Sequence, residues 1–401
     1  MHDPDQAGAE LDSTAGVPDI TAGRSVSIAG QWLAPGRVNL IGEHTDYNDG
    51  FVLPIALPQG VTCTAASGAN GEVRVASRQR PGAVVTWPIP EIDDSESGDA
   101  VGRVRHWPDW ARYPLGVAAE YLRRGHPITG VDLELDGTVP MGAGLSSSAA
   151  LSCSVAVALR DLFAPGLTDA ELIDIARTAE NEYAGVPTGI LDQSASILCR
   201  AGHALFLDVR TREHRQIPFD LERFGLRLLV IDTRSPHRLV DGEYARRRAQ
   251  CEAAAATLGV ASLRDIATIG DTRRIGEPVL RRRARHVVSE NLRVRQVADI
   301  LGAGRDPREV GPILTAGHAS LRDDFEVSTD RLNTAVEAAL TAGAYGARMV
   351  GGGFGGSVIA LVDARRAACV TGVVEAAFAE SDFAVPHAFP VVASAGAHRV
   401  E

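Results

Sequence analysis

The chain contains no lysine, and this absence restricts the ways in which it can bind a phosphate group. All 40 residues counted as lysine or arginine are arginine. Phosphate-binding P-loops and protein-kinase folds both place a lysine on the phosphates of a nucleotide. The sequence therefore excludes the standard form of both folds, and any nucleotide chemistry requires a different phosphate site.

Length and hydropathy predict two globular domains. The chain has 401 residues, of which 45% are hydrophobic, and its mean hydropathy is near zero. These values are typical of a soluble protein long enough for two cores. Residues 1–24 are acidic and lack an apolar run, so we expect a disordered tail, no signal peptide and a cytoplasmic protein. No segment approaches the ~20 apolar residues of a transmembrane helix.

Net charge and cysteine spacing argue against further classes of protein. The formal charge of −11 disfavours general nucleic-acid binding. The five cysteines stand singly, without a CxxC pair, which indicates reduced thiols rather than a disulfide framework or a zinc site. We expect neither a nucleic acid nor a membrane as a partner.

A polar turn follows the first predicted strand. The apolar run 38–41 is typical of a strand that ends at Gly42, with Arg37 just before it. The turn then gathers carboxylate, imidazole and amide side chains: Glu43, His44, Asp46, Asn48 and Asp49. Such groups can bind a polyhydroxylated ligand, and an arginine beside them can face a phosphate. An ordinary surface turn rich in aspartate and asparagine is the alternative, which these residues alone leave open.

A glycine- and serine-rich segment precedes a predicted helix at 151–163. Residues 140–150 are PMGAGLSSSAA. Glycines allow backbone amides to approach an anion, serines add hydroxyl donors, and the helix directs its positive end to the same place. The segment could therefore bind phosphate without lysine. A serine-capped helix after a tight turn is an equally good interpretation of these residues alone.

Two acidic residues flank a break between helices. A capping box at 168–171 opens a helix that carries Glu180 near its end. An acid there opposes the helix dipole unless it faces a cation, although a solvent-facing glutamate is common. After the break at 185–189, Asp192 lies in the first turn of the next helix. The dipole alone would explain an aspartate at that position.

The pattern changes near residue 202. Strands are predicted at 204–209, 226–232 and 358–362, and helices at 244–258, 287–303, 312–321 and 332–342. We interpret the arginine runs 246–248 and 281–285 as solvated helix faces. The glycines of 351–356 satisfy GxGxxG, but a β-branched strand follows them and no βαβ unit does, which disfavours dinucleotide binding. Glycines between two strands fit a loop close to a ligand or to another backbone.

The order and the residues of these motifs resemble those of the GHMP small-molecule kinases. Within that superfamily, residues 36–48 resemble the galactokinase signature, and the likeness continues at 189–193, 242–244, 285–288 and 320–325. The resemblance implies an α+β protein with two domains. The N-terminal one, predicted at 25–205, would resemble domain 2 of ribosomal protein S5. The C-terminal one, predicted at 206–401, would be ferredoxin-like.

The resemblance also implies an activity and a set of site residues. It implies that ATP phosphorylates the anomeric hydroxyl of α-D-galactose, with Mg²⁺, in the first committed step of the Leloir pathway, and we expect a monomer. The chemistry would fall to Arg37 and Asp192, and Mg²⁺ to Ser148 and Glu180, although a one-residue slip would change the serine. The sugar would contact Glu43, His44, Asp46, Gly189, Asp192 and Tyr244. The ATP phosphates would contact Gly142, Ala143, Gly144, Leu145, Ser146, Ser147 and Ser148.

Two alternatives stay open within the same fold. A kinase for N-acetylgalactosamine or another aldose would need more space beside the second carbon of the sugar. A galactose sensor without turnover would be expected to lose the serine segment or the aspartate, and both Ser148 and Asp192 are present. The sequence therefore favours a catalyst over a sensor.

Overall fold

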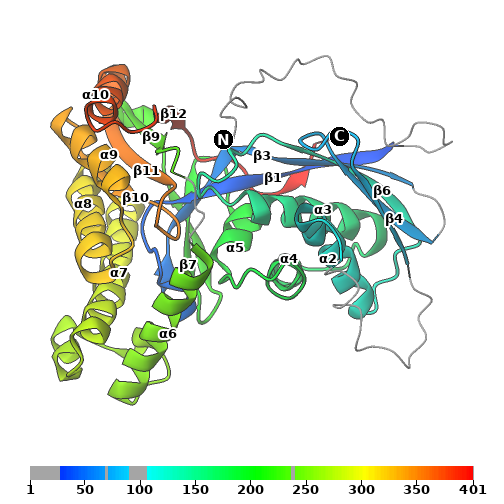
Figure 1. Cartoon of the computed structure of the whole chain (residues 1–401), viewed down its shortest axis with the longest axis horizontal. Helices are drawn as coiled ribbons and strands as arrows, with labels where there is room; N and C mark the ends of the chain where they lie inside the picture. Colours follow the sequence, from blue (N-terminus) through cyan, green and yellow to red (C-terminus); the bar gives the residue numbers. More distant parts are fainter. Residues whose placement is uncertain (1–27, 68–70, 90–105, 236–239, 401) are drawn as a thin grey trace, which may run out of the picture.

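The computed structural model describes residues 28–67, 71–89, 106–235 and 240–400 (Figure 1). The tail predicted at 1–24 lies outside the described residues. In Figure 1 the earlier part of the chain forms a layer of sheet over helices on the right, and the later helices and strands stand beside it on the left. Within the described part, no helix combines the length and the apolar character needed to cross a membrane.

The first sheet has six strands in the order β13-β1-β3-β6-β4-β5. The pair β4–β6 is parallel and the other pairs are antiparallel. Residues 61, 63 and 65 are buried, and the threonines between them are partly exposed, because alternate side chains of a strand face opposite sides of the sheet. The strands are β1 (Ile28–Asn39), β3 (Pro54–Ser67), β4 (Glu72–Ser77), β5 (Val84–Pro88), β6 (Val131–Gly137) and β13 (His398–Arg399).

Four helices cover one face of this sheet (Figure 1). They are α2 (Asp109–Arg123), α3 (Ser147–Phe163), α4 (Asp169–Thr178) and α5 (Leu191–Leu198). The middle of α3 is buried nearly all round, as expected of a helix whose whole circumference is apolar or small. The predicted capping box at 168–171 is confirmed. A five-residue π-helix, Ala179–Tyr183, follows α4 and carries Glu180.

The second sheet has four antiparallel strands in the order β10-β11-β9-β12. Numbered by their appearance in this sheet, the order is 2-3-1-4, which is that of a ferredoxin-like domain and confirms the predicted fold. The strands are β9 (Leu226–Asp232), β10 (Gly346–Met349), β11 (Ser357–Asp363) and β12 (His387–Val391). The helices are α6 (Val240–Leu258), α7 (Pro278–Gly302), α8 (Gly311–Ser320), α9 (Asp330–Thr341) and α10 (Ala367–Glu380).

A small third sheet and the last strand connect the two halves of the chain. The third sheet has the order β2-β7-β8, with β2 (Phe51–Val52), β7 (His203–Asp208) and β8 (His214–Pro218). The strand β13 returns from the C-terminal half to pair with β1, so that Arg399 lies opposite Trp32. The boundary near residue 205 stays a prediction.

Helix α7 begins nine residues before the predicted start at 287. The side chain of Glu277 accepts hydrogen bonds from the amides of Val279 and Leu280, and a proline occupies the first turn. This cap and the proline suffice to start the helix. The sequence did not predict these first turns because they are rich in arginine and lack the periodic apolar residues on which the prediction of a helix depends.

The prediction that both arginine runs form solvated helix faces is wrong for two of their members. Arg247 is 5% exposed and Arg283 is 1% exposed. Arg247 donates hydrogen bonds to the carbonyl oxygens of Phe325 and Glu326. Arg283 donates to the carbonyl of Asp324. These buried guanidinium groups satisfy backbone carbonyls at the end of a π-helix, Leu321–Phe325.

The contact between α8 and β10 tests this packing. A Cβ atom at Gly346 would lie 2.0 Å from the carbonyl oxygen of Gly311, whereas one at Gly372, on α10, would meet no atom within 4 Å. We expect Gly346→Ala to lower the midpoint of thermal unfolding, since overpacking costs about 1–3 kcal/mol. Gly372→Ala, the matched control, should leave the midpoint unchanged or raise it. Equal midpoints for the two variants would contradict the close backbone approach.

Candidate active site

The polar turn at residues 42–50, here called the strand-end turn, is buried except at residues 46, 47 and 49, which are partly exposed. Gly42 has φ +111°, and a Cβ atom there would lie 2.7 Å from the carbonyl oxygen of Phe51. The Thr45 hydroxyl lies 2.7 Å from the carbonyl oxygens of both Gly42 and Phe51. Glu43 and His44 are 3% and 5% exposed. The alternative of an ordinary surface turn is therefore wrong.

The segment that precedes α3 adopts an unusual backbone. Gly142 and Gly144 have φ near +74°, and Ser146 has φ +58°, a left-handed conformation that residues with a side chain rarely adopt. The Ser146 side chain does not cap the helix but donates to Asp192 Oδ2 at 2.5 Å. The alternative of a serine-capped helix is therefore wrong, and no side chain in the described ranges caps the first-turn amides of α3.

An ion pair joins this segment to β1 and α5. Arg37 donates from Nε to Asp192 Oδ1 at 2.7 Å, and its Nη2 atom lies 2.6 Å from the same oxygen. Arg37 Nη1 also donates to the carbonyl oxygen of Gly144 at 2.8 Å. Asp192 thus contacts an arginine and a serine hydroxyl, and its position is set by more than the dipole of α5.

Glu180 lies on the π-helix and is buried. Its Oε1 atom accepts from the Ser148 hydroxyl at 2.7 Å, and its Oε2 atom accepts from Gln193 Nε2 at 2.6 Å. Burial raises the pKa of Glu180 to about 7. Among the residues that the structure describes, Glu180 forms no ion pair. The idea of a solvent-facing glutamate is wrong, since the side chain is nearly inaccessible.

The donor set around Glu180 fits a magnesium ion. A carboxylate and a hydroxyl oxygen lie together, and no arginine in the described ranges pairs with the carboxylate. Mg²⁺ often binds proteins through one or two carboxylates and takes its other ligands from water and phosphate. In the described part, no group of three histidine, cysteine, aspartate or glutamate residues that could hold a metal ion is present.

Asp46 and Gly189 lie against each other in the site. A Cβ atom at residue 189 would lie 2.0 Å from Asp46 Oδ2, so a larger residue there would displace the Asp46 carboxylate. Burial, with a smaller effect of the Asp192 charge, raises the pKa of Asp46 to about 6. Burial likewise raises the pKa of Glu43 to about 7, against the opposing effect of Arg348.

His44 is held among aromatic rings. Its Nδ1 atom lies 2.8 Å from the Tyr47 hydroxyl, and its ring centre lies 5.6 Å from that of Tyr244 and 4.6 Å from that of Phe325. Burial, assisted by the nearby His286, lowers the pKa of His44 to about 3. The imidazole is therefore neutral at physiological pH and can donate or accept hydrogen bonds without adding a charge to the site.

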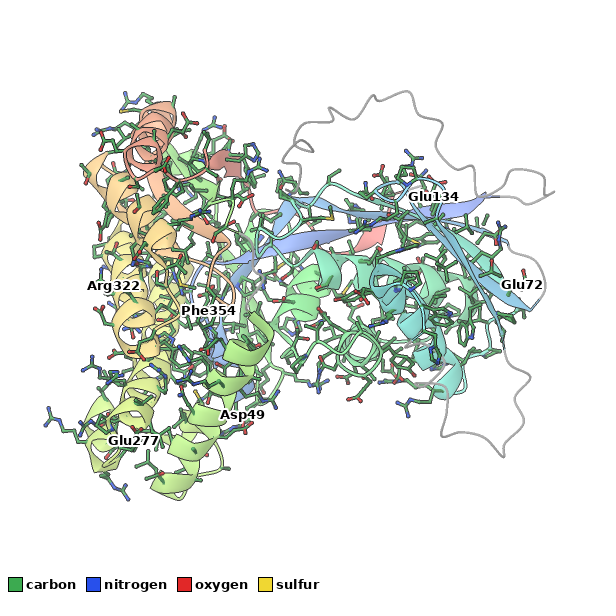
Figure 2. All side chains as sticks on the ribbon, in the orientation of Figure 1. Asp49, Glu72, Glu134, Glu277, Arg322 and Phe354 are labelled. Carbon is green, nitrogen blue, oxygen red and sulfur yellow. The ribbon has the colours of Figure 1, made fainter. Side chains whose placement is uncertain are left out.

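The loop at residues 350–356, here called the glycine loop, lies between the antiparallel strands β10 and β11. This geometry confirms that the loop is not a dinucleotide-binding turn. The Gly351 amide donates to Glu43 Oε1 at 3.3 Å, and a Cβ atom at Gly351 would lie 3.2 Å from the Gly144 carbonyl oxygen. The loop thus touches both the strand-end turn and the segment before α3. In Figure 2, Phe354 of this loop lies nearer the middle of the molecule than Arg322 and Glu277.

These elements enclose one cavity of about 500 Å³. Every residue that the sequence assigned to the site lines it except Ala143. The Ala143 side chain is packed in the core, and its carbonyl oxygen accepts from the Ser357 hydroxyl at 2.7 Å. The predicted residues that line the cavity are Arg37, Glu43, His44, Asp46, Gly142, Gly144, Leu145, Ser146, Ser147, Ser148, Glu180, Gly189, Asp192 and Tyr244.

Sequence reasoning missed several lining residues. Asn39, Tyr113, Thr188, Gly351 and Gly352 also face the cavity. The glycine loop gave a signal, because its glycines between strands indicated a close approach. Tyr113 is one of a cluster of aromatic residues that could flank a base, but core packing was the preferred interpretation. A strand-end asparagine is common in any core.

Comparisons with known proteins agree with this geometry. Residues 23–67 match the galactokinase galactose-binding signature, residues 112–200 match the N-terminal domain of GHMP kinases, and residues 294–379 match the C-terminal domain of GHMP kinases. A galactokinase of Streptomyces coelicolor is 48% identical over 375 residues, which cover 92% of this chain and 94% of the relative. A galactokinase of Mycobacterium tuberculosis is 42% identical over 91% of this chain and 97% of the relative.

Solved structures share the fold. The crystal structure of Lactococcus lactis galactokinase complexed with galactose superposes with a TM-score of 0.85 at 31% identity, covering 94% of this chain and 95% of that chain. A mevalonate kinase structure, 17% identical, superposes with a TM-score of 0.61 over 90% of this chain and 98% of that chain. From the matched motifs, the relatives and the cavity together, the chain belongs to the galactokinase family of the GHMP kinases.

Proposed function

We propose that this chain transfers the γ-phosphoryl group of ATP to the anomeric hydroxyl of α-D-galactose, giving galactose 1-phosphate and ADP in the first committed step of the Leloir pathway. The observation that carries the proposal is the position of the Arg37–Asp192 ion pair. It lies in one cavity between an uncapped helix N-terminus and a buried polar turn. The match to a galactose-binding signature supports the choice of sugar.

The sugar would lie at the strand-end turn. Carboxylates and a neutral imidazole can accept hydrogen bonds from hydroxyl groups in defined directions, and Glu43, His44 and Asp46 offer these groups in the cavity. Tyr244 supplies an aromatic wall, and Gly189 leaves the space that Asp46 occupies. Such a site discriminates between sugars, because an epimeric hydroxyl leaves a buried acceptor without its partner.

ATP would place its phosphates at the segment before α3. The left-handed backbone of Gly142, Gly144 and Ser146 and the uncapped first turn of α3 present amides to an anion. Ser148 and Glu180 would hold Mg²⁺, which supplies neutralisation of the developing phosphate charge when bound. The serine and the glutamate already lie within hydrogen-bond distance of each other.

The chemical step requires alignment more than a strong base. The anomeric oxygen attacks the γ-phosphorus, the bond to the β-γ bridging oxygen breaks, and ADP leaves. Asp192 would accept the hydrogen bond of the attacking hydroxyl and take its proton late, while Arg37 stabilises the moving charge. A loose phosphoryl-transfer transition state places little demand on the base. The arginine beside Asp192 is compatible with that role.

The proposal also includes a cellular compartment and an oligomeric state. The five cysteines carry free thiols, which suits a reducing compartment such as the cytoplasm. The monomeric state remains a prediction from the sequence.

Substrate choice is tested by ADP release from the purified chain with ATP, Mg²⁺ and each of four sugars: galactose, N-acetylgalactosamine, glucose and arabinose. We expect turnover with galactose and at least about a hundredfold less with glucose, because its epimeric hydroxyl would leave a buried acceptor unpaired. Preference for N-acetylgalactosamine would instead identify a related kinase of the same fold that acts on that sugar. Binding of galactose without ADP release would indicate a sensor and refute the proposal.

Substitution Asp192→Asn tests the chemical step. The amide keeps the size of the side chain but cannot take the proton and weakens the pairing with Arg37, so we expect turnover to be lost while galactose binding stays measurable by calorimetry. Asp174→Asn is the matched control, since Asp174 pairs with Arg212 away from the cavity. Turnover close to that of the unmodified chain in Asp192→Asn would contradict the assigned role.

The raised pKa values of Glu43 and Asp46 predict a pH dependence. Below about 6 for Asp46 and about 7 for Glu43 the carboxyl groups are protonated and accept hydrogen bonds less strongly. The KM for galactose should therefore fall as pH rises through these values, as steady-state kinetics can measure. Glu43→Gln should remove the part of the fall near pH 7. A KM that is constant or rises over this range would refute the assignment.

A further inference from the structure

Arg348 lies behind the sugar end of the cavity and is not among its lining residues. It belongs to β10, and its side chain is fully buried. The guanidinium group forms an ion pair with Glu43 Oε2, lies 3.2 Å from Glu290 Oε1 and donates to the Leu40 carbonyl oxygen at 3.0 Å. One buried cation thus contacts the end of β1, the strand-end turn and α7.

Glu290 extends the same network. Its Oε1 atom accepts from the Gly42 amide at 3.0 Å, and its Oε2 atom accepts from Arg293 at 2.7 Å. Burial raises the pKa of Glu290, but the charges of Arg293 and Arg348 outweigh it and lower the value to about 2. The strand-end turn is therefore attached to α7 by Glu290 and to β10 by Arg348.

The charges of this network balance. Two carboxylates, Glu43 and Glu290, face two guanidinium groups, Arg348 and Arg293. Removal of Arg348 would leave two buried carboxylates next to each other, and a buried charge without a partner is strongly unfavourable. Proton uptake by Glu43 would relieve the repulsion between the two carboxylates. Glu43 would take the proton because Glu290 is still paired with Arg293, whereas Glu43 would have lost Arg348.

Charged and titratable groups reach Glu43 from every neighbouring element: Arg37 from β1, Arg348 from β10, and Glu290 and His286 from α7. Burial lowers the pKa of His286 to about 4, so it is neutral at physiological pH. Its Nε2 atom lies 3.1 Å from the Glu43 carbonyl oxygen. Arg348 is the cation with the largest effect on the Glu43 carboxyl group.

We propose that Arg348 is a positioning residue for sugar recognition and that it fixes the Glu43 carboxylate at the sugar end of the cavity. Sugar binding would then depend on β10, the strand that carries Arg348. Arg348 would act through Glu43 and touch neither sugar nor ATP. The inference rests on the proposed function, since it assumes that Glu43 binds the sugar. If Arg348 had a purely structural role, its substitution would instead lower the stability of the fold without a selective effect on the KM of one substrate.

The test is steady-state kinetics of Arg348→Met beside the control Arg74→Met. Arg74 also pairs with a fully buried carboxylate, Asp132, but in the first sheet. We expect Arg348→Met to raise the KM for galactose about tenfold or more, with the KM for ATP unchanged within about twofold. The fall in galactose KM with pH should move to higher pH. Arg74→Met should lower thermal stability and leave both KM values and the pH profile unchanged.

A double variant separates action through Glu43 from a general effect. Glu43→Gln with Arg348→Met should bind galactose no more weakly than Glu43→Gln alone, because the positioned group is already absent. Additive losses, or equal changes in both KM values, would overturn the inference. If Arg348→Met does not fold, Arg348→Lys is the variant to test, because lysine keeps the charge but lacks the forked guanidinium group. The KM for galactose should then rise without a shift in the pH profile. An unchanged KM would overturn the inference.

The same data distinguish this inference from the proposed function. If the unmodified chain phosphorylates galactose and the Arg348 variants keep its galactose KM, the inference fails and the function stands. If the unmodified chain does not phosphorylate galactose, the proposed function fails.

Discussion

The arrangement of the cavity depends on the ion pair between Arg37 and Asp192. Arg37 is at the end of β1 and Asp192 is in the first turn of α5, so the pair fixes a strand against a helix. The same arginine holds the Gly144 carbonyl, and the same aspartate accepts from Ser146. Because both partners also hold the segment before α3, the parts of the cavity proposed for the phosphates and for the sugar are positioned by the same ion pair.

Burial has opposite consequences for the acids and the imidazole at the sugar end. It raises the pKa of Glu43 and Asp46 and lowers that of His44. The acids therefore titrate close to physiological pH, while the histidine stays neutral. A polyhydroxylated ligand bound as proposed would meet groups whose hydrogen bonds are strengthened by low local polarity but whose net charge is small.

Periodicity and local motifs predicted most elements, including β9 at residues 226–232 and the capping box at 168–171. The strand-end turn and the segment before α3 were found because their residue types conflict with a plain strand or loop. The burial of Arg283 and the pairing of Arg348 with Glu43 were not predicted. Both depend on contacts between distant parts of the chain, which leave no local pattern. Ala143 was assigned to the phosphate site by its place in a motif, yet its side chain packs inward.

The pairing of β13 with β1 has a consequence for biosynthesis. The outer edge of the first sheet is formed by residues 398 and 399, which lie opposite residues 33 and 32. That pairing cannot form until residues 398 and 399 have left the ribosome, although β1 emerges early. Contacts of such high sequence separation slow folding, and residues 32 and 33 of β1 lack this second partner until β13 has been translated.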